Sequence, residues 1–217
     1  MVRLSSASVI VILIACSLAQ SMLCQGVAIP WAPPKYNFFS SSQSKIPHEI
    51  IRSLRLADMQ IVLEKTTLKQ VQKRFGGAIG RRGDAGNSEG WLCYQGSDAA
   101  GKWILWLTSD EMHGVTEISD FQWRLLKSDQ TPGSRCKQLP SDGNEIELAQ
   151  PIRIGATQEQ ILKVLGKPST TGSNSYYYTH EHPATFHNEA CTVWNGVTVE
   201  FSEGVVAVIE GGLLSSC

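Results

Sequence analysis

Histidines gather in one short stretch of the chain. Three of its five histidines, His180, His182 and His187, fall within eight residues, together with Glu181. Imidazole nitrogens and a carboxylate oxygen are ligands for zinc or copper, so this stretch could hold a metal ion. The spacing matches no established metal motif, and Pro183 favours an exposed loop. A metal-binding periplasmic protein that uses the His180–His187 loop is therefore the alternative function, and no cofactor is assigned.

Two glycine-containing segments resemble catalytic motifs in outline only. Gly86–Gly90 fits the Gly-x-Ser-x-Gly pattern of serine hydrolases, but that motif needs a strand before the serine and a helix after it. Here a Gly/Asp loop precedes the segment and a strand-like run follows it. Gly76–Gly83 lacks the glycine spacing and the Lys-Ser/Thr ending of a phosphate loop. Both segments are predicted to be loops, and we expect no enzymatic activity.

The composition excludes several classes of protein. The chain has 217 residues, of which 42% are hydrophobic and 18% charged, and these values are typical of a globular protein rather than a disordered or fibrous one. The 19 Lys and Arg residues nearly balance the 20 Asp and Glu residues, so the formal net charge is -1. Because nucleic-acid binders need a surplus of positive charge, no nucleic-acid partner is expected.

The beginning of the chain has the pattern of an export signal. Arg3 is followed by an uninterrupted apolar run at residues 9–15, which is too short to cross a bilayer as a permanent helix. Small residues suit cleavage after Ala19 or after Ala28, and cleavage after Ala28 leaves an even number of cysteines. We therefore predict that residues 1–28 are a signal peptide and that the protein is exported to the periplasm or the medium.

A second route of export would attach the protein to a membrane. Residues 13–16, Leu-Ile-Ala-Cys, look like the lipobox of bacterial lipoproteins, in which the cysteine becomes the lipidated N-terminus. Cleavage would then fall before Cys16, and Ser17 is compatible with sorting to the outer membrane. A lipid on Cys16 is the only membrane attachment that the sequence predicts.

An internal repeat predicts the helices and strands that would position the candidate functional residues. Residues 60–76 and 150–166 align without a gap and share five identical positions of 17. Both copies contain Thr-x-x-Gln, the pattern of a capping box at the start of a helix. Apolar residues at helical spacing follow, and each copy ends at a glycine suited to a helix C-terminus.

Strand-like runs follow each predicted helix and define the fold class. They lie at residues 91–95, 102–108 and 115–123, and at 175–179, 197–201 and 205–209. We predict an α+β protein of two tandem repeats, each a helix plus a three-stranded antiparallel meander. The domain boundaries are a proline- and serine-containing tether at 29–45, the first repeat at 46–126, a linker at 127–145 and the second repeat at 146–217.

One segment resembles a known family. Residues 152–168 resemble the signature I-x-x-G-x-T-x-x-Q-V-x-x-x-L-G-x-P of the SmpA/OmlA (BamE-like) envelope lipoprotein family. The first copy departs from it, since Lys65 replaces the glycine and Gly77 and Ala78 end the motif. The tandem arrangement is similar to the β-lactamase inhibitory protein family, which places two such units side by side. The resemblance implies helices packed on one face of a sheet, with the other face open.

Four cysteines in the body of the chain predict two disulfides, for which three connectivities exist. Cys136 and Cys217 each follow the last strand of their half, whereas Cys93 and Cys191 lie among the earlier strands. This symmetry favours Cys93–Cys136 and Cys191–Cys217. The inhibitory-protein family keeps its bridges within each repeat, which agrees with that pairing.

The open face of the implied sheet is the candidate binding surface. Side chains alternate along a strand, so Trp103, Leu105 and Leu107 would point to the helices. Ile104 and Trp106 would then lie on the open face, and Tyr176 and Tyr178 share one face of their strand. Exposed aromatic residues favour protein recognition, unless the aromatic tail at residues 31–39 or the other repeat covers them.

These observations predict a non-catalytic, exported protein-binding module of the bacterial envelope. It would act like an assembly factor or an inhibitor, with a protein partner in the envelope or outside the cell. The residues expected to bind that partner are Ile104, Trp106, Tyr176 and Tyr178.

Overall fold

The computed structural model describes residues 27–34, 46, 49–84, 88–110, 116–140, 145–186 and 188–217. Strands account for 55% of the described residues and helices for 10%, so this part of the protein is mostly β. Among the described residues, no helix has the length and apolar character needed to cross a membrane.

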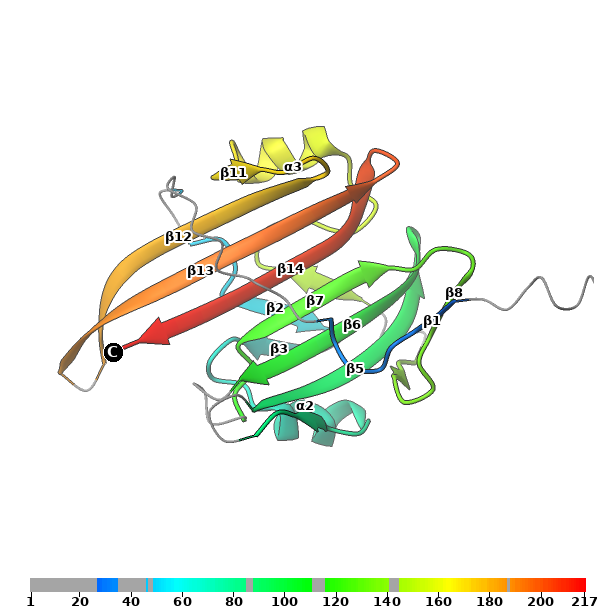
Figure 1. The fold of residues 1–217 in the computed structure, drawn as a ribbon, viewed down its shortest axis with the longest axis horizontal. Helices are drawn as coiled ribbons and strands as arrows, with labels where there is room; N and C mark the ends of the chain where they lie inside the picture. Colours follow the sequence, from blue (N-terminus) through cyan, green and yellow to red (C-terminus); the bar gives the residue numbers. More distant parts are fainter. Residues whose placement is uncertain are drawn as a thin grey trace, which may run out of the picture.

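A nine-stranded sheet dominates the structure (Figure 1). Eight of its strands form a continuous path of antiparallel neighbours, and the ninth, β9 (Lys137–Gln138), pairs in parallel with β5. The order along the path is β11 (Thr170–Thr171), β12 (Ser175–Phe186), β13 (Glu189–Ser202), β14 (Val205–Ser216), β7 (Asp120–Leu125), β6 (Gly101–Asp110), β5 (Glu89–Asp98) and β4 (Gly80–Arg82).

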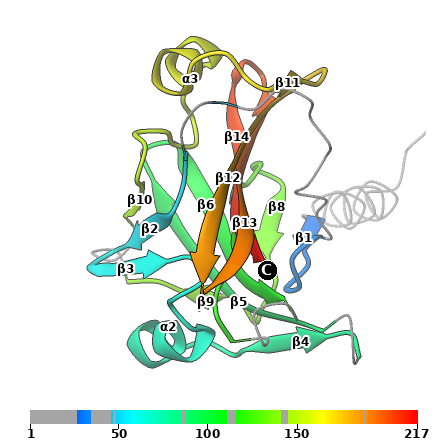
Figure 2. The ribbon, with the colours of Figure 1, turned by 90° about the vertical axis from the view of Figure 1, so that its left-hand side faces the viewer.

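Smaller elements cover the two faces of this sheet. The helices and a three-stranded sheet lie on one face, which we call the helix face, and a parallel two-stranded pair lies on the other, the non-helix face (Figure 2). The helix face carries α2 (Leu68–Phe75), α3 (Gln158–Leu165), β10 (Ile146–Leu148), β2 (Ser53–Leu56) and β3 (Met59–Val62). The non-helix face carries β1 (Val27–Ile29) and β8 (Gln130–Pro132).

The predicted fold class is wrong. The two halves do not form tandem helix-plus-meander units, because β14 of the second half pairs directly with β7 of the first half and merges their strands into one sheet. The second-half strands also run much further than predicted, and β12 continues through Pro183 to Phe186. Beyond Tyr177, β13 is the only described strand that pairs with β12, and an edge position tolerates a proline, which has no N–H to donate.

Both predicted helix starts are confirmed. Thr67 and Thr157 accept hydrogen bonds from the backbone N–H groups of Gln70 and Gln160, whose side chains reach back to the threonine N–H groups. Each helix ends at a glycine with a φ of 75°, a conformation that glycine adopts without strain. The local capping pattern was therefore sufficient to locate both helices.

Alternation along the central strands divides the apolar residues between two clusters. Trp103, Leu105 and Leu107 are fully buried in the main core between the sheet and the helices, as predicted. Ile104 and Trp106, which point the other way, belong to a second cluster on the non-helix face. The sheet is therefore buried on both faces in its first half.

A tyrosine hydroxyl closes the end of each helix. Tyr94 donates to the carbonyl oxygen of Gly76 at 3.0 Å, and Tyr178 donates to that of Gly166 at 3.2 Å. Both rings are almost completely buried in the main core. Burial disfavours the phenolate and raises the pKa of both side chains well above their ordinary value of 10.0.

We expect these two tyrosines to make the protein lose stability in alkaline solution. Above about pH 10 they ionise in the unfolded chain before they ionise in the folded one, so rising pH favours unfolding. The double variant Tyr94→Phe/Tyr178→Phe should show a smaller fall in Tm between about pH 9 and pH 11, measured by circular dichroism. Tyr177→Phe, at a half-buried neighbour, is the control. An identical alkaline fall in wild type and double variant would contradict this expectation.

Candidate functional site

The non-helix face is covered over the first half of the sheet. Residues 27–34, which we call the strap, lie over Trp91, Ile104 and Trp106. Ile104 is 0% and Trp106 1% exposed, so the face that was expected to be open is closed here. Part of the segment predicted to be signal peptide or irregular tether is thus ordered on the sheet, because Ile29 and Trp31 bury apolar surface there.

The two predicted tyrosines lie on the opposite face. Tyr178 is 1% exposed and packs in the main core. Tyr176 is half-buried, with its ring edge-on to Phe201 at 4.9 Å. The residue between them, Tyr177, pairs with Thr198 and points to the non-helix face. Alternation showed correctly that Tyr176 and Tyr178 share a face, but it could not tell which face.

Strand pairing aligns a row of side chains across the non-helix face. The row crosses five neighbouring pairs of strands, and each member is the registered partner of the next: Tyr177, Thr198, Glu210, Gln122, Trp106 and Cys93. We call it the central row. It is polar in the middle and aromatic near both ends, so the face combines hydrogen-bonding groups with apolar contact area.

The middle of the central row is hydrogen-bonded and poorly accessible to water. Thr198, Glu210 and Gln122 are 4%, 3% and 7% exposed. The Gln122 amide donates to one carboxylate oxygen of Glu210, across the β14–β7 junction where the two halves of the sheet meet. The carboxylate, the amide and the hydroxyl thus form a buried polar centre between the two halves of the sheet.

Aromatic side chains flank the polar centre on the second half of the sheet. Trp194 is half-buried, and its indole N–H donates to the Glu181 carboxylate at 3.1 Å. Its register with Glu181 and Leu214 places it on the same face as Tyr177. The sequence alone did not single out Trp194 or Tyr177. The alternation of side chains along β12 and β13 places both on this face once the pairing of the two strands is known.

The described histidines do not form a metal centre. His180 and His182 are part of β12 rather than of a loop, with ring centroids 5.3 Å apart. His180 Nδ1 donates to the carbonyl oxygen of Ile46 at 2.9 Å, so that nitrogen is already engaged. Within the described part of the chain, no group of three His, Cys, Asp or Glu side chains is placed to hold a metal ion. His187 lies outside the described residues.

In the Gly-x-Ser-x-Gly segment, Ser88 directly precedes β5, and Glu89 and Gly90 are the first residues of that strand. Ser88 donates to the carbonyl oxygen of Asp84 at 2.9 Å, and strands flank the loop on both sides. A hairpin cannot present a serine on the strand-to-helix elbow that hydrolases use. Gly86 and Asn87 lie outside the described residues, as do Cys16 and the rest of residues 1–26.

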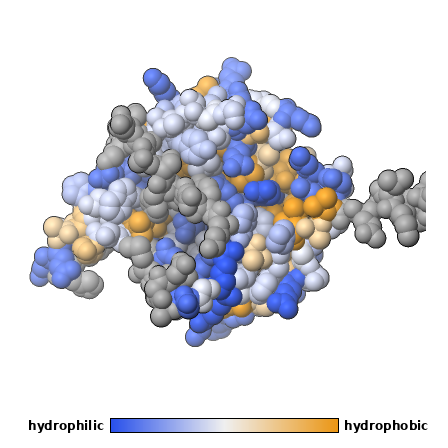
Figure 3. Space-filling view, in the orientation of Figure 1, coloured by the Kyte–Doolittle hydropathy of each residue, from blue (hydrophilic) through white to orange (hydrophobic). Residues whose placement is uncertain are grey.

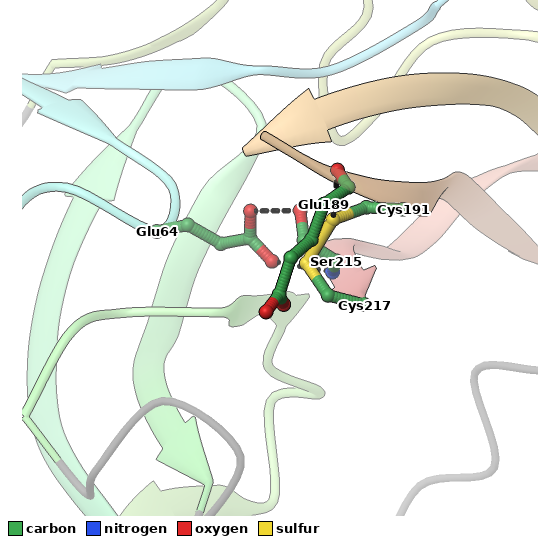
Figure 4. Close-up of a disulfide and its surroundings, with 5 residues drawn as sticks. All are labelled: Glu64, Glu189, Cys191, Ser215 and Cys217. Atoms are coloured by element: carbon green, nitrogen blue, oxygen red, sulfur yellow. Dashed lines mark hydrogen bonds between the residues drawn. A yellow bond between two sulfur atoms is a disulfide. The ribbon is translucent and has the colours of Figure 1, made fainter. Parts of the chain in front are cut away.

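Two disulfides cross-link the described part of the chain. They join Cys93 to Cys136 and Cys191 to Cys217, the pairing that the symmetry of the halves favours. Beside the second bridge, the Glu64 carboxylate accepts from the backbone N–H of Ser215 at 2.7 Å and from its hydroxyl at 2.6 Å (Figure 4). Disulfides persist in oxidising compartments, so the two bridges indicate an exported protein.

The fold and this face define a mostly β protein with a polar and aromatic sheet surface. Comparison of the chain with models of protein families, with characterised proteins and with solved structures finds no match. The resemblance to the SmpA/OmlA and β-lactamase inhibitory protein families therefore stays a prediction of the sequence.

Proposed function

We propose that this protein is a non-catalytic, exported protein-binding module that recognises its partner through the non-helix face of the main sheet. The observation that carries the proposal is the central row, in which buried hydrogen-bonding groups stand between aromatic residues. Trp194 and Tyr177 are the expected anchors, in place of the buried Ile104, Trp106 and Tyr178. Tyrosine and tryptophan side chains are typical of the energetic centres of protein interfaces.

The two faces of the sheet differ in a way that supports this assignment. Over the central strands, the helix face is covered by α2, α3 and the small sheet, and most side chains of these strands are buried in the main core. On the second half of the non-helix face, Tyr177, Trp194 and Leu214 keep part of their surface exposed. A partner that covered these side chains would bury apolar area.

A photo-crosslinking amino acid at position 177 tests the proposal. Produced in an exporting host and irradiated, the protein should form a discrete crosslinked adduct with a second protein. The same amino acid at Leu162, which is 39% exposed on α3 of the helix face, is the matched control and should form none. With the captured partner, Trp194→Ala should weaken binding by about tenfold or more. Adducts of equal intensity at both positions, or unchanged binding by Trp194→Ala, would overturn the proposal.

The same experiment locates the protein in the cell. The proposal includes export through the segment around Arg3 and either release or a lipid anchor on Cys16. If the adduct at position 177 sediments with membranes, the anchored form is favoured, and recovery from the soluble periplasmic fraction or the medium favours release.

A further inference from the structure

The strap is a proline-rich segment that packs against aromatic side chains of the sheet. Its last six residues are Ile-Pro-Trp-Ala-Pro-Pro. The Trp31 ring meets Trp91 edge-on with centroids 5.2 Å apart, and the Arg135 guanidinium lies 4.9 Å from the centre of the Trp31 ring. Apolar side chains gather at the surface over β1 (Figure 3). Trp31 is therefore held by an aromatic ring and by a cation.

Two side-chain donors recognise the strap through its carbonyl groups. The Trp106 indole N–H donates to the carbonyl oxygen of Trp31 at 3.0 Å, and the Arg82 guanidinium donates to that of Pro33 at 2.9 Å. Proline has no N–H, so a proline-rich chain offers a binding site mainly carbonyl oxygens and apolar rings. Aromatic-lined grooves use this combination to bind proline-rich peptides.

The strap does not fill the space available to it. A cavity of about 490 Å³ remains beside it, lined by Pro30, Pro33, Pro34, Arg82, Trp106 and Arg124. The Nε atom of Arg124 is buried and has no hydrogen-bond partner among the described residues. The groove thus has room and a spare donor for a longer or bulkier peptide than the strap.

We infer that the groove formed by Trp91, Trp106 and Arg82 is a binding site for proline-rich peptide segments, and that the strap occupies it as an internal ligand. A partner segment that contains prolines and an aromatic residue displaces the strap and takes its two hydrogen bonds. This inference rests on the proposed function, because it names the chemistry of a partner for the same face. A tethered occupant competes at high effective concentration, so the groove binds free peptide weakly until the strap leaves.

Gly133 provides a way to displace the strap without changing the groove. A β-carbon at this position would lie 3.0 Å from both the carbonyl oxygen of Ile29 and the backbone nitrogen of Trp31. Backbone atoms cannot rotate away as a flexible side chain can, so Gly133→Val should displace the strap from Trp91 and Trp106. The residues that line the groove stay unchanged in this variant.

The test measures binding of a fluorescent synthetic peptide of residues 27–34 to the full-length protein. We expect Gly133→Val to bind it at least about tenfold more tightly than wild type does, because the internal competitor is gone. The same peptide with Trp31→Ala should not bind, and adding Trp106→Phe to Gly133→Val should weaken binding about fivefold through loss of one hydrogen bond. Equal binding of both peptides by folded Gly133→Val would overturn the inference.

Two further measurements keep the test decisive. If Gly133→Val does not fold, the protein variant Trp31→Ala serves in its place. In the unprocessed wild-type chain, excess peptide should accelerate hydrogen exchange of the Val27 amide, which bonds to the carbonyl oxygen of Asp129 at 2.7 Å; no acceleration would contradict the inference. Loss of peptide binding with retained crosslinking at position 177 would overturn only this inference and leave the proposed function standing.

Discussion

Replacing Asn195 by alanine is expected to lower the free energy of unfolding by about 4 kcal/mol and Tm by about 10 °C. The Asn195 side chain is fully buried. Its oxygen accepts from the N–H groups of Ile50 and Ile51 at 2.8 and 3.1 Å, and its nitrogen donates to the carbonyl oxygens of Ile51 and Gly212. Alanine would leave these buried backbone groups without a partner, which costs far more than the loss of an exposed hydrogen bond.

Urea unfolding measures the global loss of stability, and hydrogen exchange measures the local loss of protection at Ile50 and Ile51. Asn174→Ala, at an exposed asparagine in the turn before β12, is the control and should change stability by less than about 0.5 kcal/mol. The amides of Ile50 and Ile51 should exchange faster in Asn195→Ala, because the side chain ties this segment to the sheet. A loss of stability no larger than in the control would show that the segment is held by packing alone.

Removing the Cys93–Cys136 disulfide is expected to cost more stability than removing Cys191–Cys217. The bridges span sequence separations of 43 and 26 residues, for which loop-closure entropy gives about 4 and 3.5 kcal/mol. Packing widens the difference, because Cys93 and Cys136 are both buried in the apolar cluster beneath the strap. At the other bridge, the hydrogen bonds from Ser215 to Glu64 still hold the end of β14.

The double variants Cys93→Ala/Cys136→Ala and Cys191→Ala/Cys217→Ala make this comparison. Calorimetry under non-reducing conditions should give Tm values below that of wild type, with the first variant lower by several degrees. Adding a reductant should destabilise wild type but leave a variant that lacks the four bridged cysteines unchanged, which controls for effects of the reductant itself. A lower Tm for the second variant would contradict the expected order.

Local sequence patterns predicted several parts of this structure correctly. The two capping boxes located α2 and α3, since the Thr and Gln side chains satisfy backbone groups within the same turn. The alternation of side chains along β6 correctly placed Trp103 and Leu105 on one face of the sheet. It placed Ile104 and Trp106 on the other. The symmetry of the cysteines favoured the two disulfides of the structure. Each of these features depends on neighbours along the chain or on simple symmetry.

Errors arose where distant segments meet. The pairing of β14 with β7 decides that one sheet forms instead of two units, and it depends on the fit of whole strand faces. The register of β12 against β13 decides that Tyr177, rather than Tyr176 and Tyr178, points to the non-helix face. A shift of one residue would reverse this outcome, so the tyrosine pattern alone left both orientations open.

The histidine stretch shows the same limit. Its composition suited a metal-binding loop, but pairing with β13 extends His180 and His182 along an edge strand, where the His180 ring bonds to Ile46. The sequence did not predict the polar centre of the candidate site either. Gln122 and Glu210 are 88 residues apart in the chain and come into contact only where the two halves of the sheet pair.

The sequence by itself determined where the helices start, which side chains alternate and how many cysteines could pair, because these depend on the chemistry of residues close together in the chain. Only the tertiary structure decided that the halves share one sheet, that the strap covers Ile104 and Trp106, and that a polar row crosses the junction. Those outcomes depend on which surfaces, far apart in the chain, bury the most apolar area against each other. The periodicity of residues within one strand carries no information about that choice.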